Sequence, residues 1–249
     1  MLSLFTASTM RRRLGMPGLD QVGWYTFKCP PTPGTFSSAR GWYILGARRG
    51  ATLNDPGEYP ASCSADPKSG RLAVTNYLAA RGGRGSVSVY ENARGSPKIY
   101  ADDRIFQYGF CAYDSNGDLF IDGFKTLQKG FEFAELPYGS KVFKSINLGL
   151  HMKDWAGPLR WGDGQDIALA DPRAHAIDRL DNGRIVGSVP LKDYTGSDFF
   201  IEKGQIGTVL PVTRGPVSFW KYPEGGSRTR SFLLNPQPMD IPFYVTVSK

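Results

Sequence analysis

Four segments of this chain repeat one pattern, and the repeat limits the possible folds more than any other feature of the sequence. Each copy has an apolar stretch, a tight turn with glycine, a second apolar stretch, and then two further strand-like stretches. The turn glycines are Gly70, Gly117, Gly164 and Gly204, about 40 to 47 residues apart. This spacing is the length of one four-stranded blade. The sequence therefore predicts an all-β fold, a β-propeller of four-stranded blades.

The copies can be aligned over both halves of each repeat. The first two strands and their turn run over Cys63–Asn76, Cys111–Asp122, Leu159–Asp171 and Phe199–Val209, and the third strands over Val87–Glu91, Phe131–Glu135, Ala176–Leu180 and Val217–Lys221. Composition agrees with this pattern. In 249 residues there are 30 glycines and 18 prolines, which suit many turns, and 13% aromatic residues, which suit half-buried strands. Such a length is sufficient for one large domain with a substantial core.

The C-terminal end of the chain predicts how the ring closes. Residues 235–247 match the opening strand of a new repeat, and a single inner strand would leave an open edge. We expect strands within residues 22–54 to complete that blade with residues 239–247. The prediction is a propeller of five blades over residues 22–249, preceded by an N-terminal arm over residues 1–21. An incomplete six-bladed propeller is the alternative, because the composition changes near residue 50.

Several classes of protein and partner receive no support from the sequence. No stretch reaches 18 apolar residues, so no transmembrane helix is predicted, and apolar residues 1–10 precede Arg11–Arg13, which reverses the order of a secretory signal. We expect a soluble chain without a targeting segment. The net charge is +7, but the basic residues are scattered and no nucleic-acid motif accompanies them, so nucleic acid is not an expected partner.

The aligned repeats resemble the NHL and SMP-30 (gluconolactonase-like) group of β-propellers. The similarity covers residues 58–234, and its best local match to the SMP-30-like subgroup is Gly57–Pro60 followed by Asp66–Leu72. In that subgroup a Gly-Glu-x-Pro segment supplies a carboxylate to a divalent metal, usually calcium, in the central channel. The resemblance therefore implies that Glu58 is a metal ligand.

Positions at the start of each first strand are expected to surround the mouth of the channel. Carboxylates from different blades would converge there, and Ca²⁺ prefers oxygen ligands of this kind. A bound metal would polarise a carbonyl or phosphoryl oxygen and lower the pKa of a water molecule. The candidate metal ligands are Glu58, Asp154, Asp193 and Asp198, and the candidate catalytic residues are Asp154 as general base, His151 as base or ligand, and Lys153 as oxyanion contact.

Other polar residues have a structural explanation from the sequence. Four of them occupy the glycine turns and are interpreted as turn formers, namely Asp66, Asp114, Asn116 and Asp163. Three more end the strand after that turn and are expected to close the next loop, namely Asn76, Asp122 and Asp171. Cys63 and Cys111 are expected to be small buried residues, and His175 to lie in a surface loop. Two histidines are too few for a multi-histidine zinc site.

Two functional hypotheses follow. The first is a calcium-dependent hydrolase of lactones, esters or organophosphate-type esters at the channel. The second is a non-catalytic NHL-like propeller that binds a protein, peptide or sugar, for which exposed aromatic residues such as Trp155, Trp161 and Trp220 would be suited.

Overall fold

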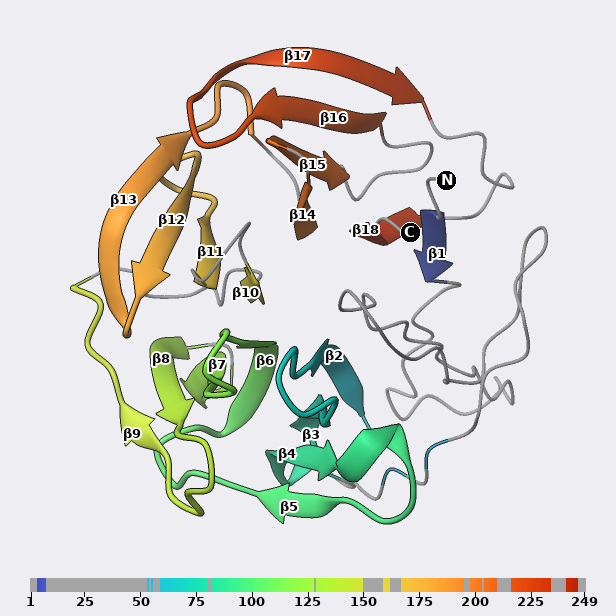
Figure 1. The fold of residues 1–249 in the computed structure, drawn as a ribbon, viewed down its shortest axis with the longest axis vertical. Helices are drawn as coiled ribbons and strands as arrows, with labels where there is room; N and C mark the ends of the chain where they lie inside the picture. Colours follow the sequence, from blue (N-terminus) through green and yellow to red (C-terminus); the bar gives the residue numbers. More distant parts are fainter. Residues whose placement is uncertain are drawn as a thin grey trace.

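The structure is a computed structural model, and it shows four four-stranded antiparallel sheets arranged around an axis (Figure 1). It describes residues 4–7, 53, 55, 59–79, 82–127, 129–149, 159–161, 167–194, 198–202, 204–209, 216–233 and 241–245. Within each sheet the strands follow one another in sequence from the inside of the ring outward. The predicted all-β propeller is therefore confirmed, with four blades in the described part of the chain.

The blades are numbered I to IV in chain order. Blade I contains β2 (Pro60–Ala65), β3 (Leu72–Leu78), β4 (Arg84–Tyr90) and β5 (Lys98–Tyr100), with the short 3₁₀ segment η2 (Glu91–Ala93) after β4. Blade II contains β6 (Gln107–Tyr113), β7 (Leu119–Thr126), β8 (Lys129–Leu136) and β9 (Lys144–Ser145). Blade III contains β10 (Leu159–Trp161), β11 (Ile167–Asp171), β12 (Ala176–Asp181) and β13 (Arg184–Pro190). Blade IV contains β14 (Asp198–Glu202), β15 (Gln205–Val209), β16 (Pro216–Lys221) and β17 (Gly225–Leu233).

The turns between first and second strands form where the repeat predicts them. Gly70, Gly117 and Gly204 have positive φ angles of 73°, 84° and 69°, a conformation in which a side chain would be strained. Gly164 lies outside the described residues. These glycines let each inner strand reverse into the next strand within a few residues.

The core lies between neighbouring blades. Residues of β3 and β4 pack against β6, β7 and β8, and blades III and IV share a cluster that contains Phe199 and Trp220. Between blades II and III, the rings of Phe120, Phe133 and Phe131 stack in a row, with centroids 5.9 and 6.5 Å apart. Blades I to IV therefore each bury a face against a neighbouring blade and depend on these contacts.

A fifth, two-stranded sheet lies between blades IV and I (Figure 1). It pairs β1 (Leu4–Ala7) with β18 (Ile241–Val245) in antiparallel register, with Leu4 opposite Val245. The predicted C-terminal strand is thus present. Its described partner comes from residues 4–7 and not from the predicted residues 22–54, which lie outside the described residues apart from Leu53.

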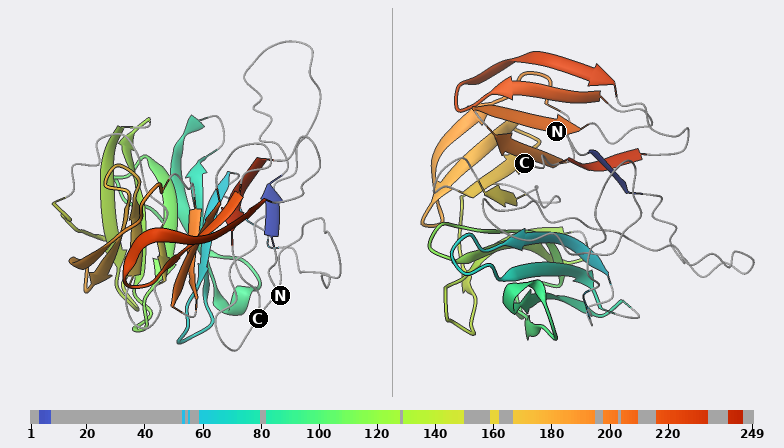
Figure 2. Two further views of the ribbon diagram at one scale, coloured as in Figure 1. Left: turned by 90° about the horizontal axis from the view of Figure 1, so that it is seen from above. Right: turned by 45° about the vertical axis from the view of Figure 1, so that its right-hand side comes forward.

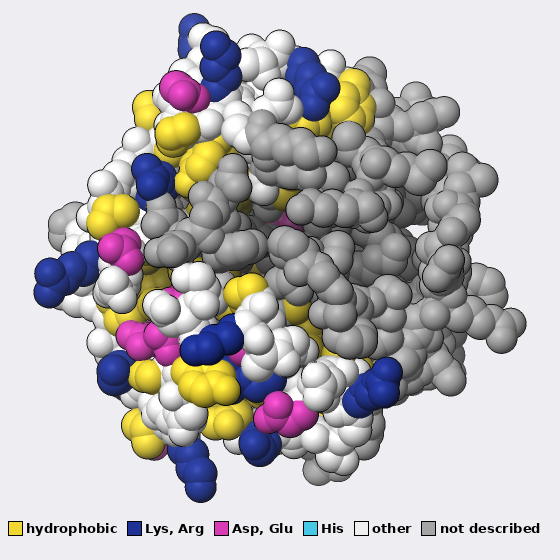
Figure 3. Space-filling view, viewed as in Figure 1, with side chains coloured by type: hydrophobic (Ala, Val, Ile, Leu, Met, Phe, Trp, Pro, Cys, Tyr) yellow, Lys and Arg dark blue, Asp and Glu magenta, His cyan; other side chains and the backbone are white. Residues whose placement is uncertain are grey.

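Charged side chains are spread over the described surface. On the described part of the face shown in Figure 3, lysine, arginine and acidic side chains are scattered and do not gather in one patch. Within the described residues, no helix is long and apolar enough to cross a lipid bilayer.

Candidate functional site

The antiparallel order of the strands gives the propeller two different faces. Turns from first to second and from third to fourth strands lie on one face, which we call the turn face. The connections between blades and between second and third strands lie on the opposite face, which we call the linker face. Residues 114–118 and 181–183 therefore belong to the turn face, and residues 191–194 belong to the linker face.

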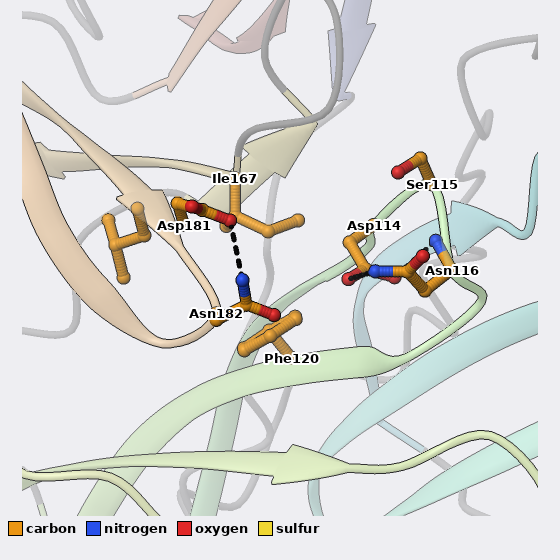
Figure 4. A pocket seen from close by; sticks show the side chains of 8 residues that line it. Asp114, Ser115, Asn116, Phe120, Ile167, Asp181 and Asn182 are labelled. Carbon is orange, nitrogen blue, oxygen red and sulfur yellow. Dashed lines mark hydrogen bonds between the residues drawn. The ribbon is translucent and has the colours of Figure 1, made fainter.

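A polar pocket of about 80 Å³ opens on the turn face between blades II and III. It is lined by Asp114, Ser115, Asn116, Phe120, Ile167, Leu180, Asp181 and Asn182. Figure 4 shows Asp114 and Asn116 on one side and Asp181 and Asn182 on the other, with Phe120 between them. Apolar side chains of β7, β11 and β12 form the base, and carboxylates and amides of the two turns form the walls.

Asp114 is held by its own turn. Its Oδ1 accepts hydrogen bonds from the backbone N–H groups of Asn116 (2.9 Å) and Asp118 (2.8 Å). Its Oδ2 accepts one from Asn116 Nδ2 at 3.3 Å. Burial raises the pKa of Asp114, and the charge of Asp118 adds to this effect, although the backbone hydrogen bonds oppose it. A carboxylate in this position would be stabilised by a cation.

The opposite wall is a two-residue hairpin turn. Asn182 and Gly183 have φ angles of 47° and 72°, the left-handed conformation that an Asn-Gly pair adopts easily between two strands. Asn182 Nδ2 donates a hydrogen bond to Asp181 Oδ1 at 2.9 Å, and both residues are exposed. The turn therefore presents a carboxylate towards the mouth of the pocket. The Asn-Gly pair in the sequence was the signal that could have placed Asp181 on this face.

Further acidic groups lie close to the pocket. Burial raises the pKa of Glu135, and the charges of Asp118 and Asp114 raise it further, whereas Lys144 lowers it. Lys144 Nζ is 3.9 Å from Glu135 Oε1. Three carboxylates thus lie near one another here, those of Asp114, Asp118 and Glu135, while Lys68 and Arg71 contact carbonyl oxygens of the Asp114 turn.

An exposed tyrosine lies next to this acidic region, on the same face. Tyr138 is 53% exposed, and its ring centroid lies 5.0 Å from Lys68 Nζ and 4.5 Å from Arg71 Cζ. The backbone N–H of Tyr138 donates to Asp118 Oδ1 at 2.6 Å, and Lys68 Nζ donates to the carbonyl of Asn116 at 3.5 Å. The pocket and the tyrosine therefore form one continuous surface across blades I to III.

The predicted channel site can be followed only in part. Glu58, His151, Lys153 and Asp154 lie outside the described residues. Asp193 is exposed in a turn with φ 61° on the linker face, whereas Asp198 is fully buried at the start of β14.

Asp198 influences a neighbouring tyrosine. Burial raises the pKa of Tyr194, and the charge of Asp198 contributes. Among the described residues, no group of three His, Cys, Asp or Glu side chains is placed to hold a metal ion. The predicted ring of carboxylates stays a prediction.

The polar residues of the turns behave as predicted. Asp66 accepts hydrogen bonds from its own turn, including one from Lys68 N at 2.9 Å, and Asp114 and Asn116 form the equivalent turn of blade II. Asp171 Oδ1 accepts from the N–H groups of Arg173 and Ala174, both at 3.0 Å, so it closes its loop as expected. Asp163 lies outside the described residues.

Two residues expected to close loops are buried in strands instead. Asp122 is completely buried and accepts a hydrogen bond from Phe110 N at 2.5 Å, where the pairing of β6 with β7 is irregular between Tyr108 and Cys111. Its side chain thus satisfies a backbone donor at a β-bulge. Asn76 is also fully buried, and its Nδ2 donates to Ser88 Oγ at 3.1 Å.

The remaining predictions concern cysteine, histidine and tryptophan. Cys63 and Cys111 are both buried, as expected, but Cys63 is disulfide-bonded whereas Cys111 is a thiol. His175 is exposed, and its Nδ1 lies 2.8 Å from the carbonyl oxygen of Tyr194. The expectation that Trp220 is exposed was wrong.

Trp220 is only 1% exposed because its side of β16 faces blade III. There it packs edge-to-face against Tyr194, with ring centroids 6.4 Å apart, and Nε1 donates to the carbonyl of Lys192 at 3.1 Å. The side chains of Trp155 and Trp161 lie outside the described part of the chain.

Comparison with known proteins supports the fold and goes no further. The sequence matches no protein-family model and no curated protein sequence. Its structure is similar to a chain in the crystal structure of a nidogen/laminin complex, with a TM-score of 0.51 and 9% sequence identity, over 78% of this chain and 87% of that chain. At this identity the similarity shows the fold alone, so the chain is a β-propeller structurally similar to nidogen, with no family assigned.

Proposed function

We propose that this β-propeller is a binding protein, in which the pocket on the turn face receives a lysine or arginine side chain of a protein or peptide partner. The observation that carries the proposal is that two carboxylates, those of Asp114 and Asp181, line one small pocket from two different blades. A cationic group between these carboxylates would be attracted by both, and charge-assisted hydrogen bonds are stronger than neutral ones.

The other walls of the pocket suit the same ligand. The side-chain amides of Asn116 and Asn182 already donate to the neighbouring carboxylates, which leaves their carbonyl oxygens as acceptors. The ring of Phe120 at the base would pack against the methylene groups of a long basic side chain. Tyr138 and Lys68 beside the pocket would contact the rest of the partner, because exposed aromatic residues are enriched at interfaces.

A titration with isolated side chains tests this proposal directly. We expect Nα-acetyl-arginine amide or its lysine analogue to shift the NMR signals of the Asn116 and Asn182 side-chain amides, with a Kd on the order of 1 mM. Asp181→Asn should weaken the response several-fold. Asp171→Asn is the matched control, because Asp171 closes a loop on the linker face. A response to glucose in place of arginine, or none to either cation, would contradict the proposal.

The calcium-dependent hydrolase remains a second hypothesis, motivated by Asp198. This carboxylate is fully buried at the start of β14, the innermost strand of blade IV, where the sequence predicts a channel metal. We expect a hydrolase to cleave a lactone or aryl ester only when Ca²⁺ is present, and to lose that activity with a chelator. Asp198→Asn should lower the rate at least about a hundredfold. Hydrolysis that ignores calcium, or no hydrolysis at all, excludes this hypothesis.

We also propose a ring of five blades, with β1 and β18 in the fifth and a relationship to the NHL and SMP-30-like propellers. Two observations support the fifth blade. Blade IV carries a row of aromatic rings on the face that points away from blade III, formed by Phe200, Phe219 and Phe232. Phe219 is only 2% exposed on that face, and β18 contacts β14 and β15 beside it.

A further inference from the structure

The outermost strand of blade IV has an unusually long exposed edge. Strand β17 spans nine residues, and every residue from Gly226 to Phe232 is exposed. The outermost strands of blades I, II and III have three, two and seven residues, so β17 is the longest of the four. Short outer strands protect a sheet from pairing with other chains, and β17 lacks this protection. Figure 2 shows β17 running along the outside of the ring.

The outer side of β17 has one described contact, at its beginning. Leu191 forms a parallel bridge with Gly226, and Lys192 N donates to the carbonyl of Gly226 at 2.8 Å. From Ser227 onward, no other described strand pairs with this edge, since β16 lies on its inner side.

The pairing of β17 with β16 is irregular between Gly225 and Arg230 and regular from Arg230 to Leu233. Alternate backbone N–H and C=O groups of an edge strand point outward, so Arg230–Leu233 presents donors and acceptors, and the bulge before it allows Arg228 and Arg230 to lie on different faces.

Two arginines flank the edge. Arg230 Nη2 donates to Gln205 Oε1 at 3.1 Å, and its Cζ lies 4.0 Å from the centroid of the Phe219 ring. Arg228 Nη1 donates to Ser218 Oγ at 3.4 Å. Because Ser218 and Phe219 are adjacent in β16 and point to opposite faces, the two guanidinium groups lie on opposite faces of the blade. Among the described residues, no carboxylate forms an ion pair with either arginine.

We propose that β17 binds an extended, acidic segment of a partner protein as a fifth strand of blade IV. Backbone hydrogen bonds along Arg230–Leu233 would hold the segment, which is the mode of binding called β-augmentation. Side chains of the added strand alternate between the two faces, so glutamates or aspartates on either face would meet Arg228 or Arg230. This site is separate from the pocket on the turn face and does not depend on the function proposed for that pocket.

The same charges disfavour other occupants. A second copy of the chain, paired edge to edge through β17, would bring its arginines beside Arg228 and Arg230, and like charges across a strand pair are destabilising. A nucleic acid would use the arginines but would leave the outward carbonyl groups without donors from its phosphates. An acidic peptide strand satisfies the donors, the acceptors and the charges together.

The test uses a labelled synthetic peptide of about eight residues in which glutamate alternates with threonine. We expect fluorescence anisotropy to show binding to the full chain, and amide hydrogen exchange to show protection of β17 when the peptide is bound. The double variant Arg228→Glu, Arg230→Glu should weaken binding at least about tenfold. Arg184→Glu, on the outer strand of blade III, should leave it unchanged and serves as the matched control.

Two further peptides distinguish the addition of a strand from simple attraction between charges. A peptide that alternates glutamate with proline keeps the charges but lacks half of the backbone donors, so it should not bind. A peptide that alternates lysine with threonine should not bind either. Equal binding of the proline peptide, unprotected β17 amides, an equal effect of Arg184→Glu, or dimerisation of the chain through β17 would each overturn the proposal.

Discussion

At the scale of the residue, Arg71 joins blade I to blade II. Its Nη2 donates to Asp66 Oδ2 at 2.9 Å and to the carbonyl of Gly117 in blade II at 3.1 Å. Its guanidinium also lies over the rings of Tyr113 and Tyr138, at 5.6 and 4.5 Å from their centroids. Since Asp66 is completely buried and Arg71 is 17% exposed, this pair is shielded from the screening that weakens surface ion pairs.

Asp66 and Asp114 occupy equivalent turns, yet their pKa values shift in opposite directions. Burial alone would raise the pKa of Asp66, but hydrogen bonds from Ser69, Lys68 and Arg71 outweigh it and lower the pKa below the ordinary value of 3.8. For Asp114, burial and the negative charge of Asp118 outweigh the hydrogen bonds from Asn116 and Asp118, and the pKa is raised. The difference arises because an arginine follows the first turn, and an aspartate takes part in the second.

These two shifts predict opposite pH dependences of stability. A lowered pKa means that Asp66 stabilises the fold above its ordinary pKa and that this stability is lost as pH falls through the lower folded value. A raised pKa means that Asp114 stabilises the fold at low pH and that this stability is lost as pH rises through the folded value. Urea unfolding between about pH 3 and pH 7 should therefore show that Asp66→Asn reduces the loss of stability in acid, whereas Asp114→Asn increases it. Equal changes of slope in both variants would contradict the assignment.

At the scale of the element, a strand glycine allows β3 and β4 of blade I to approach closely. Gly85 in β4 donates its N–H to the carbonyl of Phe106, in the connection to blade II, at 2.9 Å. A Cβ at this position would overlap the carbonyl oxygen of Asn76 and lie 2.6 Å from that of Tyr77. Neither of these backbone atoms can move without disturbing the pairing of β3 with β4. Gly85 is therefore required by the approach of neighbouring backbone and not by its own φ angle.

We expect Gly85→Ala to lower the free energy of unfolding by roughly 2–3 kcal/mol, as forced overpacking does. Gly187→Ala in β13 is the matched control, because no atom lies within 4 Å of a Cβ built there. Its effect should stay within about 0.5 kcal/mol. Chemical denaturation of both variants provides the measurement, and similar effects of the two substitutions would show that close approach at Gly85 is not the cause.

The sequence predicts turns better than it predicts the polar residues inside strands. The turns of Asp66 and Asp114 are determined locally, by an aspartate and a glycine a few residues apart, so the repeat reveals them. The place of Asp122 depends on a bulge in β6 that exposes the N–H of Phe110, and regular alternation gives no sign of such a bulge. The pocket was missed for a related reason, since Asp114 and Asp181 lie in different blades and only the packing of the blades brings them together.

At the scale of the whole molecule, the pairing of β1 with β18 connects the two ends of the propeller. The periodicity predicted the C-terminal strand because residues 239–247 match other inner strands. It did not predict Leu4–Ala7 as the partner, because four residues outside the repeat carry too little pattern to specify a register. The fold class was therefore accessible from sequence, whereas the closing contact was not.

If this pairing closes the ring, breaking it should destabilise the entire domain. We expect Phe5→Pro, which disrupts the ladder opposite Tyr244, to lower the thermal midpoint of a single cooperative transition by about 5–10 °C. Ile99→Pro, on the exposed outer strand β5, should have a smaller effect. Calorimetry compares the two variants. A separate early transition, or a larger effect of Ile99→Pro, would mean that β1 and β18 are not part of the cooperative unit.

The register of β1 and β18 also determines how the molecule responds to mechanical force. Leu4 lies opposite Val245, so the chain enters and leaves this ladder at the same end. A pull on the two ends therefore loads the hydrogen bonds one after another, like a zipper, and not all at once in shear. The pairing of β1 with β18 is thus the contact that tension opens first, and stretching should separate these two strands at low force while the four blades remain folded.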